Sequence, residues 1–195
     1  LKMSELKHIP VMLEECMEGL ALKNGGTYFD GTLGGGGHSF EILKRTSLDG
    51  KLYATDLDDY AIARAEERLK EFGDRFTPVK DNFKNFSAIK DRLGIDGFDG
   101  ILLDLGVSSF QLDDKSRGFS YMAGNEVLDM RMGKDNPLTA ERIVNEYPEA
   151  RLKEILAEYG EERFAGNIAK NIVSERGKKR IITVGELNAI IEKSI

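Results

Sequence analysis

A run of four consecutive glycines at residues 34–37 constrains this chain more than any other feature. A short β-rich segment at residues 26–29 precedes the run, and an apolar-periodic segment with Phe40, Ile42 and Leu43 follows it. Because glycine has no Cβ, such a run can adopt positive φ and pass close to a ligand. A strand that leads through a glycine-rich turn into a helix is where α/β folds bind nucleotide-like ligands. The alternative is a plain tight turn without a ligand.

The glycine spacing leaves two cofactors in competition. The NAD fingerprint G-x-G-x-x-G begins with Gly34 and Gly36, but its third glycine would fall on Ser39. Enzymes that use S-adenosylmethionine carry an acid at the end of the first strand and then spaced glycines, and Asp30 stands at that position. S-adenosylmethionine has no pyrophosphate, so a third glycine matters less for it. The loop therefore fits S-adenosylmethionine better than NAD.

A second acid stands about 20 residues beyond the loop, as expected of a nucleoside site. Residues 51–56 predict a buried strand that ends at Asp56, whose carboxylate can accept hydrogen bonds from both ribose hydroxyls. Asp58 and Asp59 are expected to cap and begin the next helix, at residues 60–72. Capping is also the structural alternative for Asp56.

A third landmark is the apolar run at residues 101–103, which ends in the carboxylate of Asp104 and a Gly-Ser-rich loop. Such a run is typical of a strand buried on both faces of a parallel sheet. In a doubly wound sheet of order 3-2-1-4, the chain reverses direction between strands 1 and 4, and ligands bind at the carboxyl ends of those two strands. We therefore expect the glycine loop and Asp104 to border the same crevice.

Strands and helices alternate along the first half of the chain and then give way to helices. Strands at residues 27–33, 51–56, 76–80 and 98–104, with helices between them, predict a parallel sheet covered on both faces. After Gln111 a loop is followed by helices only. The first of these helices is expected to be capped by Asn136, with Pro137 in its first turn. Two more are expected at residues 148–160 and 161–175, and a last one begins with a capping box of Thr183 and Glu186.

The composition is that of a soluble cytoplasmic protein. Hydrophobic residues make up 41% and charged residues 32% of the 195 positions, no apolar run approaches the length of a membrane helix, and no signal-peptide pattern begins the chain. One cysteine excludes an intramolecular disulfide, and one cysteine with two histidines leaves no zinc cluster. We expect neither a metal nor a membrane partner.

The net charge of -6 argues against a nucleic-acid partner, because phosphate binding needs lysine and arginine. A local basic patch could still serve, and one run of basic residues is present. The same run can equally be a solvated helix end that complements the helix dipole, and the two interpretations stand level. Its members are Arg176, Lys178, Lys179 and Arg180, preceded on the same predicted helix by Arg163 and Lys170.

Several stretches together resemble one family, the bacterial small-subunit ribosomal RNA cytosine-N4 methyltransferases (RsmH/MraW). The similarity runs from His8 to about the end of the chain. Three departures are Phe110 and Val127, where the family usually has proline, and Leu57, where arginine is common. The matching stretches are His8-Ile-Pro-Val-Met-Leu-Glu-Glu15, Asp30-Gly-Thr-Leu-Gly-Gly-Gly-Gly-His-Ser39, Asp99-Gly-Ile-Leu-Leu-Asp-Leu-Gly-Val-Ser-Ser109, Gln111-Leu-Asp-Asp114, Arg117-Gly-Phe-Ser120, Leu128-Asp-Met-Arg-Met132 and Glu158-Tyr-Gly-Glu-Glu-Arg-Phe-Ala165.

The resemblance implies a fold and a division of the chain. The expected fold class is α/β: a Rossmann-like sheet of the class I S-adenosylmethionine methyltransferases, with strand order 3-2-1-4 present and the remainder missing, plus an inserted α-helical subdomain. Residues 1–112 would be the N-terminal part of the methyltransferase domain, and residues 113–195 a truncated helical insertion that recognises the substrate. The chain would then be a fragment, weak or inactive in catalysis, with strand 4 an exposed apolar edge covered by another chain, as in a homodimer, or by rearranged helices.

The resemblance also implies an activity, namely S-adenosylmethionine-dependent N4-methylation of a cytidine in 16S rRNA of the small ribosomal subunit. Asp104 would be the catalytic residue, and an extruded cytidine would stack on Phe110, Phe119 or Tyr121. An NAD-binding oxidoreductase and a non-catalytic RNA-binding relative are the alternatives. The expected cofactor contacts are Asp30, Gly34, Gly35, Gly36, Gly37, His38, Asp56, Phe83, Asp104 and Gln111.

Overall fold

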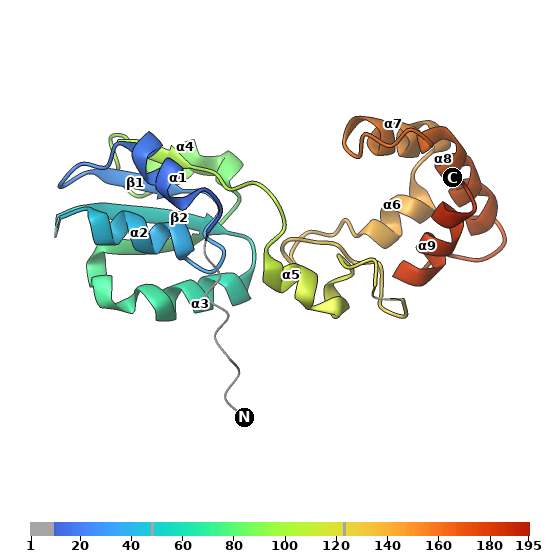
Figure 1. The fold of residues 1–195 in the computed structure, drawn as a ribbon, viewed down its shortest axis with the longest axis horizontal. Coiled ribbons are helices and arrows are strands. Elements are labelled where there is room, and N and C mark those ends of the chain that lie inside the picture. Colours follow the sequence, from blue (N-terminus) through green and yellow to red (C-terminus); the bar gives the residue numbers. More distant parts are fainter. Residues whose placement is uncertain (1–9, 48, 123) are drawn as a thin grey trace, which may run out of the picture. The chain divides into compact units, whose positions relative to one another are not determined.

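The chain forms two compact units, Leu1–Gly106 and Val107–Ile195, in a computed structural model that describes residues 10–47, 49–122 and 124–195 (Figure 1). The division lies after Gly106, whereas the sequence placed it after residue 112. The short helix α5 (Ser109–Asp113) therefore belongs to the second unit. No helix within the described ranges is long and apolar enough to cross a membrane.

The first unit is built on a four-stranded parallel sheet with the order β3-β2-β1-β4. This order confirms the predicted Rossmann-like arrangement. Its strands are β1 (Thr27–Asp30), β2 (Lys51–Asp56), β3 (Phe76–Lys80) and β4 (Gly100–Leu102). Its helices are α1 (Leu13–Leu20), α2 (Gly37–Arg45), α3 (Asp59–Leu69) and α4 (Phe86–Arg92), with the short 3-10 segments η1 (Lys70–Arg75) and η2 (Phe83–Asn85).

Strand β1 is the centre of the first unit's core. It pairs with β2 on one side and β4 on the other, with Tyr28 opposite both Leu52 and Gly100. Tyr28 and Phe29 are fully buried because a strand between two parallel neighbours is covered on both faces. Helices pack on the sheet, as the alternation of strands and helices in the sequence predicts. The carboxyl end of β1 is therefore held in a fixed position.

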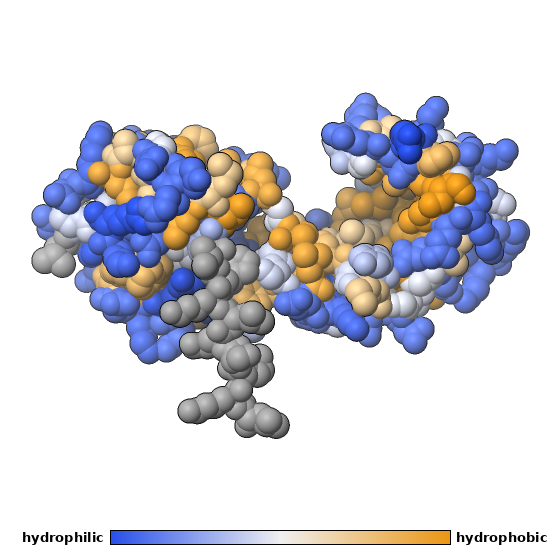
Figure 2. All heavy atoms as spheres, in the orientation of Figure 1, coloured by the Kyte–Doolittle hydropathy of each residue, from blue (hydrophilic) through white to orange (hydrophobic). Residues whose placement is uncertain are grey.

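The strand predicted at residues 98–104 is shorter and more exposed than expected. Only residues 100–102 form β4, and β4 is the last strand in the order of the sheet. Ile101 is 47% exposed and Leu103 46%, although their sequence pattern indicated a strand buried on both faces. Apolar residues lie among polar ones on the surface of this unit (Figure 2). The pattern is that of a central strand, but the position is that of an edge.

We predict that Ile101→Lys lowers the self-association of this chain, since a charge on an apolar edge strand opposes edge-to-edge pairing. Tyr159→Ser is the matched control, because it also removes an exposed apolar side chain, in the second unit, 74% exposed. Sedimentation velocity at increasing concentration measures the effect. A monomeric wild-type chain, or equal association by all three proteins, would show that the edge attracts no partner.

The second unit is helical and has its own core. An antiparallel bridge joins Val127, in the loop between η3 and α6, to Thr183, at the start of α9. Its elements after α5 are η3 (Lys115–Arg117), α6 (Ala140–Glu146), α7 (Glu149–Glu158), α8 (Ala165–Arg176) and α9 (Val184–Glu192). The buried side chains that these elements share are Leu128, Val144, Leu152, Ile168, Ala169, Ile172, Ile181, Val184 and Ile190.

The predicted helix start at Asn136 is wrong. Helix α6 begins at Ala140, and Thr139 caps it by accepting a hydrogen bond from Arg142 N at 3.1 Å. The Asn136 side chain instead accepts from Leu138 N at 3.0 Å, which closes a local turn. By contrast, the capping box of Thr183 and Glu186 is confirmed at the start of α9.

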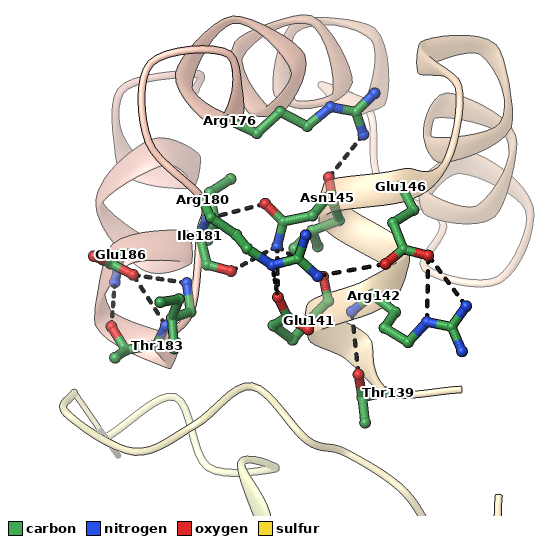
Figure 3. A network of polar contacts seen from close by, with 12 residues as sticks. Thr139, Glu141, Arg142, Asn145, Glu146, Arg176, Arg180, Ile181, Thr183 and Glu186 are labelled. Carbon is green, nitrogen blue, oxygen red and sulfur yellow. Dashed lines mark hydrogen bonds and ion pairs between the residues drawn. The ribbon is translucent and has the colours of Figure 1, made fainter. Parts of the chain in front are cut away.

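The basic run at residues 176–180 is engaged within the second unit (Figure 3). Arg176 Nη1 donates to the carbonyl oxygens of Val144 and Tyr147, at 2.8 and 2.7 Å, and so satisfies the C-terminal end of α6. Arg180 forms ion pairs with Glu141 and Glu146, at 2.5 and 3.4 Å. Lys178 pairs with Glu175 and Lys179 with Glu186. The structure therefore favours the structural interpretation of this run over a patch for phosphates.

Glu186 is the most strongly held carboxylate of the network. Lys179 and the backbone N–H groups of Ile182 and Thr183 donate to it and lower its pKa to about 2. A carboxyl whose pKa is lower in the folded protein stabilises the fold above its unfolded pKa, here 4.5, and this stabilisation is lost as the pH falls towards 2.

We predict that Glu186→Gln lowers the unfolding free energy of the second unit at pH 7 by about 1 kcal/mol, a value reduced for the partial exposure of the pair. Glutamine preserves the capping box but removes the charge. Urea unfolding of both proteins between pH 7 and pH 2 measures the difference, which should vanish near pH 2. A difference that stays constant over this range would contradict the electrostatic origin.

Candidate active site

The loops that follow β1 and β4 are hydrogen-bonded to each other at the carboxyl end of the sheet. Gly31 N donates to Leu102 O at 2.9 Å, and Asp104 N donates to Thr32 Oγ1 at 2.7 Å. These contacts bring the start of the glycine loop and Asp104 to one place, between the two strands where the chain reverses direction. Such a switch point is where open α/β sheets bind ligands.

Asp30 lies at the base of this crevice and is 1% exposed. One of its carboxylate oxygens accepts hydrogen bonds from the N–H and the hydroxyl of Thr32, at 3.0 and 3.3 Å, and the other accepts from Ser39 Oγ at 2.7 Å. Burial raises the pKa of the Asp30 carboxyl, and the hydrogen bonds and the nearby His38 partly offset this effect. In this structure Asp30 organises the loop from beneath.

Asp56 joins the end of β2 to the glycine loop. Its Oδ2 accepts from Gly34 N and its Oδ1 from Asp58 N, both at 2.9 Å. A carboxylate oxygen has two lone pairs, so each still has capacity for a ribose hydroxyl. Asp58 caps α3 by accepting from Tyr60 N at 3.1 Å, and Asp59 lies in the first turn, which confirms the capping roles predicted for both.

Two glycines of the loop have backbone conformations that other residues rarely adopt. Gly34 has φ +49° and Gly36 has φ +72°. A Cβ at Gly36 would lie 3.3 Å from Ala65 Cβ and 3.4 Å from Leu69 Cδ1, so this glycine allows α3 to pack against the loop. A Cβ at Gly34 would meet only Thr32 O, at 3.8 Å. Gly34 is thus the more open position, whereas Gly36 is a packing position.

Phe83 lies beside the start of the loop. It opens η2 after β3, and it is 36% exposed. A Cβ built on Gly31 would come within 2.8 Å of Phe83 Cβ and would overlap the side chain of Leu103. Gly31 therefore lets Phe83 and Leu103 approach the end of β1 from either side. Phe83 follows β3 in sequence but thus lies beside the end of β1.

His38 and Asp104 face each other across the crevice. His38 lies in the first turn of α2 and is 6% exposed. Its Nε2 is 3.1 Å from Val11 O, and its Nδ1 is 4.0 Å from Asp104 Oδ2. The Asp104 side chain is 47% exposed, so a ligand in the crevice can reach this carboxylate.

The remaining predicted site residues belong to the second unit. Gln111 is buried in α5, where its Oε1 accepts from Ser108 N at 3.0 Å and its own N–H donates to Ser108 Oγ. This pair is a capping box. Phe119 and Tyr121 line a small pocket together with Leu128, Met130 and Asn188, among others. Phe110, by contrast, lies in α5.

Residues 5–195 match the model of the MraW methylase family. The chain belongs to this family. The predicted resemblance to the RsmH/MraW methyltransferases is therefore confirmed.

Curated members of the MraW methylase family are similar over nearly the whole chain. Ribosomal RNA small subunit methyltransferase H 2 of Agathobacter rectalis is 52% identical over 191 residues, which is 98% of this chain and 61% of the relative. The methyltransferase H of Lachnospira eligens is 53% identical, with coverages of 98% and 60%, and that of Symbiobacterium thermophilum is 50% identical, with coverages of 96% and 59%. The chain thus spans about 60% of the length of these relatives.

A solved SAM-dependent O-methyltransferase from Thermotoga maritima is also similar, with a TM-score of 0.39 and 21% identity over 48% of this chain and 34% of that one. This similarity is too weak to support a conclusion about the function of the chain. Within the described part of the MraW chain, no three histidine, cysteine, aspartate or glutamate side chains gather as a metal site requires.

Three residues that the sequence patterns did not indicate shape the site of this member of the MraW family. Thr32 bridges Asp30 and Asp104 through one hydroxyl, and Gly31 makes room for Phe83 and Leu103. Arg68 on α3 donates to Gly35 O at 3.3 Å from outside the loop. The glycine at position 31, directly after the strand acid, was the available sequence signal for a close approach.

We predict different costs for substitutions at the two positive-φ glycines. Gly34→Ala should destabilise the first unit by about 1 kcal/mol, the cost of a left-handed conformation. Gly36→Val should cost about 3 kcal/mol, because a branched side chain also collides with α3. Urea unfolding followed by circular dichroism measures both. Equal losses would show that the packing of Gly36 against Ala65 does not matter.

Proposed function

We propose that this chain is the cofactor-binding and catalytic part of a cytoplasmic S-adenosylmethionine-dependent methyltransferase that methylates N4 of a cytidine in 16S rRNA of the small ribosomal subunit. The observation that carries the proposal is the convergence of the glycine loop, Asp56 and Asp104 at the carboxyl end of the sheet. The names of the relatives give the reaction class and the RNA.

The first unit has the groups that S-adenosylmethionine needs. Asp56 is placed at the end of β2, where its remaining lone pairs can accept from the ribose hydroxyls. Phe83 offers an exposed ring for the adenine. The backbone N–H groups at the start of α2, around His38, suit the methionine carboxylate, because a helix N-terminus favours an anion. When bound, the cofactor supplies an electrophilic sulfonium methyl group.

Asp104 is the residue that can act on the nucleophile. The exocyclic N4 of cytidine is a poor nucleophile because its lone pair is delocalised into the ring. A carboxylate that accepts from the amino hydrogens orients this lone pair and favours the positive charge that develops on N4. The bond from Asp104 N to Thr32 Oγ1 fixes the backbone of Asp104, while its carboxylate is exposed to the crevice. Positioning of this kind supplies several kcal/mol.

The second unit offers a place for the substrate base. A base must leave its stack to be methylated at N4, and an unstacked base packs well on an aromatic ring. Phe119 and Tyr121 line one pocket, and Tyr121 is 78% exposed. Asn188, whose side chain donates to Tyr121 O at 2.8 Å, adds an amide to the same lining. We propose that this aromatic pocket receives a nucleobase of the RNA.

The two alternatives predict different ligands. An NAD-dependent oxidoreductase would bind the dinucleotide at the same loop, whereas a non-catalytic relative would bind RNA without transferring a methyl group. Calorimetric titration with S-adenosylmethionine and with NAD separates the first alternative. Incubation of the complete protein with small ribosomal subunits and S-adenosylmethionine, followed by mass spectrometry of the nucleosides, separates the second. The absence of N4-methylcytidine would refute the proposed function.

We predict that Asp104→Ala abolishes methyl transfer but leaves the affinity for S-adenosylmethionine within about tenfold, because the lost contact is made mainly in the transition state. Asp81→Asn is the matched control, since Asp81 also follows a strand of the sheet but bonds Asn82 and Asn85. Calorimetry and the methylation assay give the two quantities. Near-normal turnover by Asp104→Ala would remove Asp104 from the mechanism.

A further inference from the structure

The position of the hydrogen on the His38 ring follows from its surroundings. Nε2 lies 3.1 Å from Val11 O, and a carbonyl oxygen can only accept a hydrogen bond. Nε2 must therefore carry a hydrogen in both the neutral and the charged ring. Nδ1 is then the only ring atom at which His38 can gain or lose a proton.

Nδ1 faces a carboxylate. It lies 4.0 Å from Asp104 Oδ2, slightly beyond hydrogen-bond distance. The ring is buried, whereas the carboxylate is exposed at the crevice and can rotate the short remaining distance. The pair thus connects a group that a substrate can touch to a proton site that is screened from solvent.

The other charged and titratable groups around the pair are few in the described part of the chain. Asp30, at the end of β1, interacts electrostatically with His38 from beneath. Burial raises the pKa of the Cys16 thiol on α1, and the charge of Asp104 adds to this effect. The first turn of α2 opposes a positive charge on His38, because the helix dipole is positive there. Two carboxylates therefore favour a positive charge on the His38 ring, and one helix end opposes it.

We propose that His38 is a positioning residue for Asp104 and that its Nδ1 receives the proton that Asp104 removes from the substrate amine. This inference rests on the proposed function. As the N4–methyl bond forms, the sulfur–methyl bond breaks and its electron pair remains on sulfur. N4 then loses one proton to Asp104, which passes it to Nδ1 and is a carboxylate again. The resulting imidazolium faces this carboxylate and returns its proton to water after the product leaves.

The first test concerns the pair and not the reaction. The sequence has two histidines, so His8→Gln leaves one imidazole whose nitrogen resonances report only His38. In this chain we expect the neutral ring to carry its hydrogen on Nε2. Asp104→Asn should shift the Nδ1 resonance of His38, because it replaces the carboxylate that faces this atom, while Asp81→Asn should leave the resonance unchanged. A neutral ring with hydrogen on Nδ1, or equal shifts in both variants, would overturn the proposal.

The second test concerns the reaction in the complete protein. Single-turnover methyl transfer should rise with pH, since the proton acceptor must be neutral. His38→Gln, which can still donate to Val11 O, should lose this rise and slow transfer at least tenfold, with cofactor affinity within threefold. An unchanged pH profile would overturn the role of His38. A wild-type protein that transfers no methyl group would instead refute the proposed function, whatever the resonances show.

Discussion

The burial of one carboxylate organises the site. Asp30 is taken out of water at the end of the central strand, and a buried charge is tolerated only where hydrogen bonds replace its hydration. Thr32 and Ser39 supply these bonds, from the loop and from α2, and the Thr32 hydroxyl in turn accepts from Asp104 N beyond β4. A single buried carboxyl and its partners therefore connect the loop, the start of α2 and the distant backbone of Asp104. These hydrogen bonds replace the hydration that the carboxyl has lost, and they fix the shape of the loop.

Much of the first unit could be predicted from the sequence. The strands at 51–56 and 76–80 have the expected bounds, because their apolar runs end at turn residues on both sides. The first strand was predicted too long, to residue 33, because β1 ends at Asp30 and the chain turns at Gly31, where Phe83 and Leu103 come close. Strand β4 carries the pattern of a buried strand at an edge position. A pattern reports the environment for which a segment is suited, whereas the neighbours decide the environment that it has.

The second unit was harder to predict, for a different reason. Asn136 and Thr139 are both good capping residues, and only the packing of α6 decides that Thr139 serves. The sequence left the basic run open between a patch and a helix end, because two of its acidic partners lie far along the chain: Arg180 meets Glu141 and Glu146, which precede it by more than thirty positions. Charge that is clustered in sequence is thus neutralised in space. Contact with RNA, on the proposed function, must depend on other surfaces of this unit more than on this run.

The hydrogen bond from Gly34 N to Asp56 affects how the site recognises a ligand. The carboxylate suited to a ribose is also the anchor of the loop that would surround the rest of the ligand, so the two are parts of one thermodynamic unit. If a ligand's sugar displaces the Asp56 carboxylate, the glycine loop bonded to it must also move. If another part of the ligand displaces the loop, the position of the Asp56 carboxylate that accepts from the sugar also changes. Two fragments of such a ligand, added separately, should therefore bind with an energy that differs from the sum of their own, and the site would recognise a whole molecule better than its pieces.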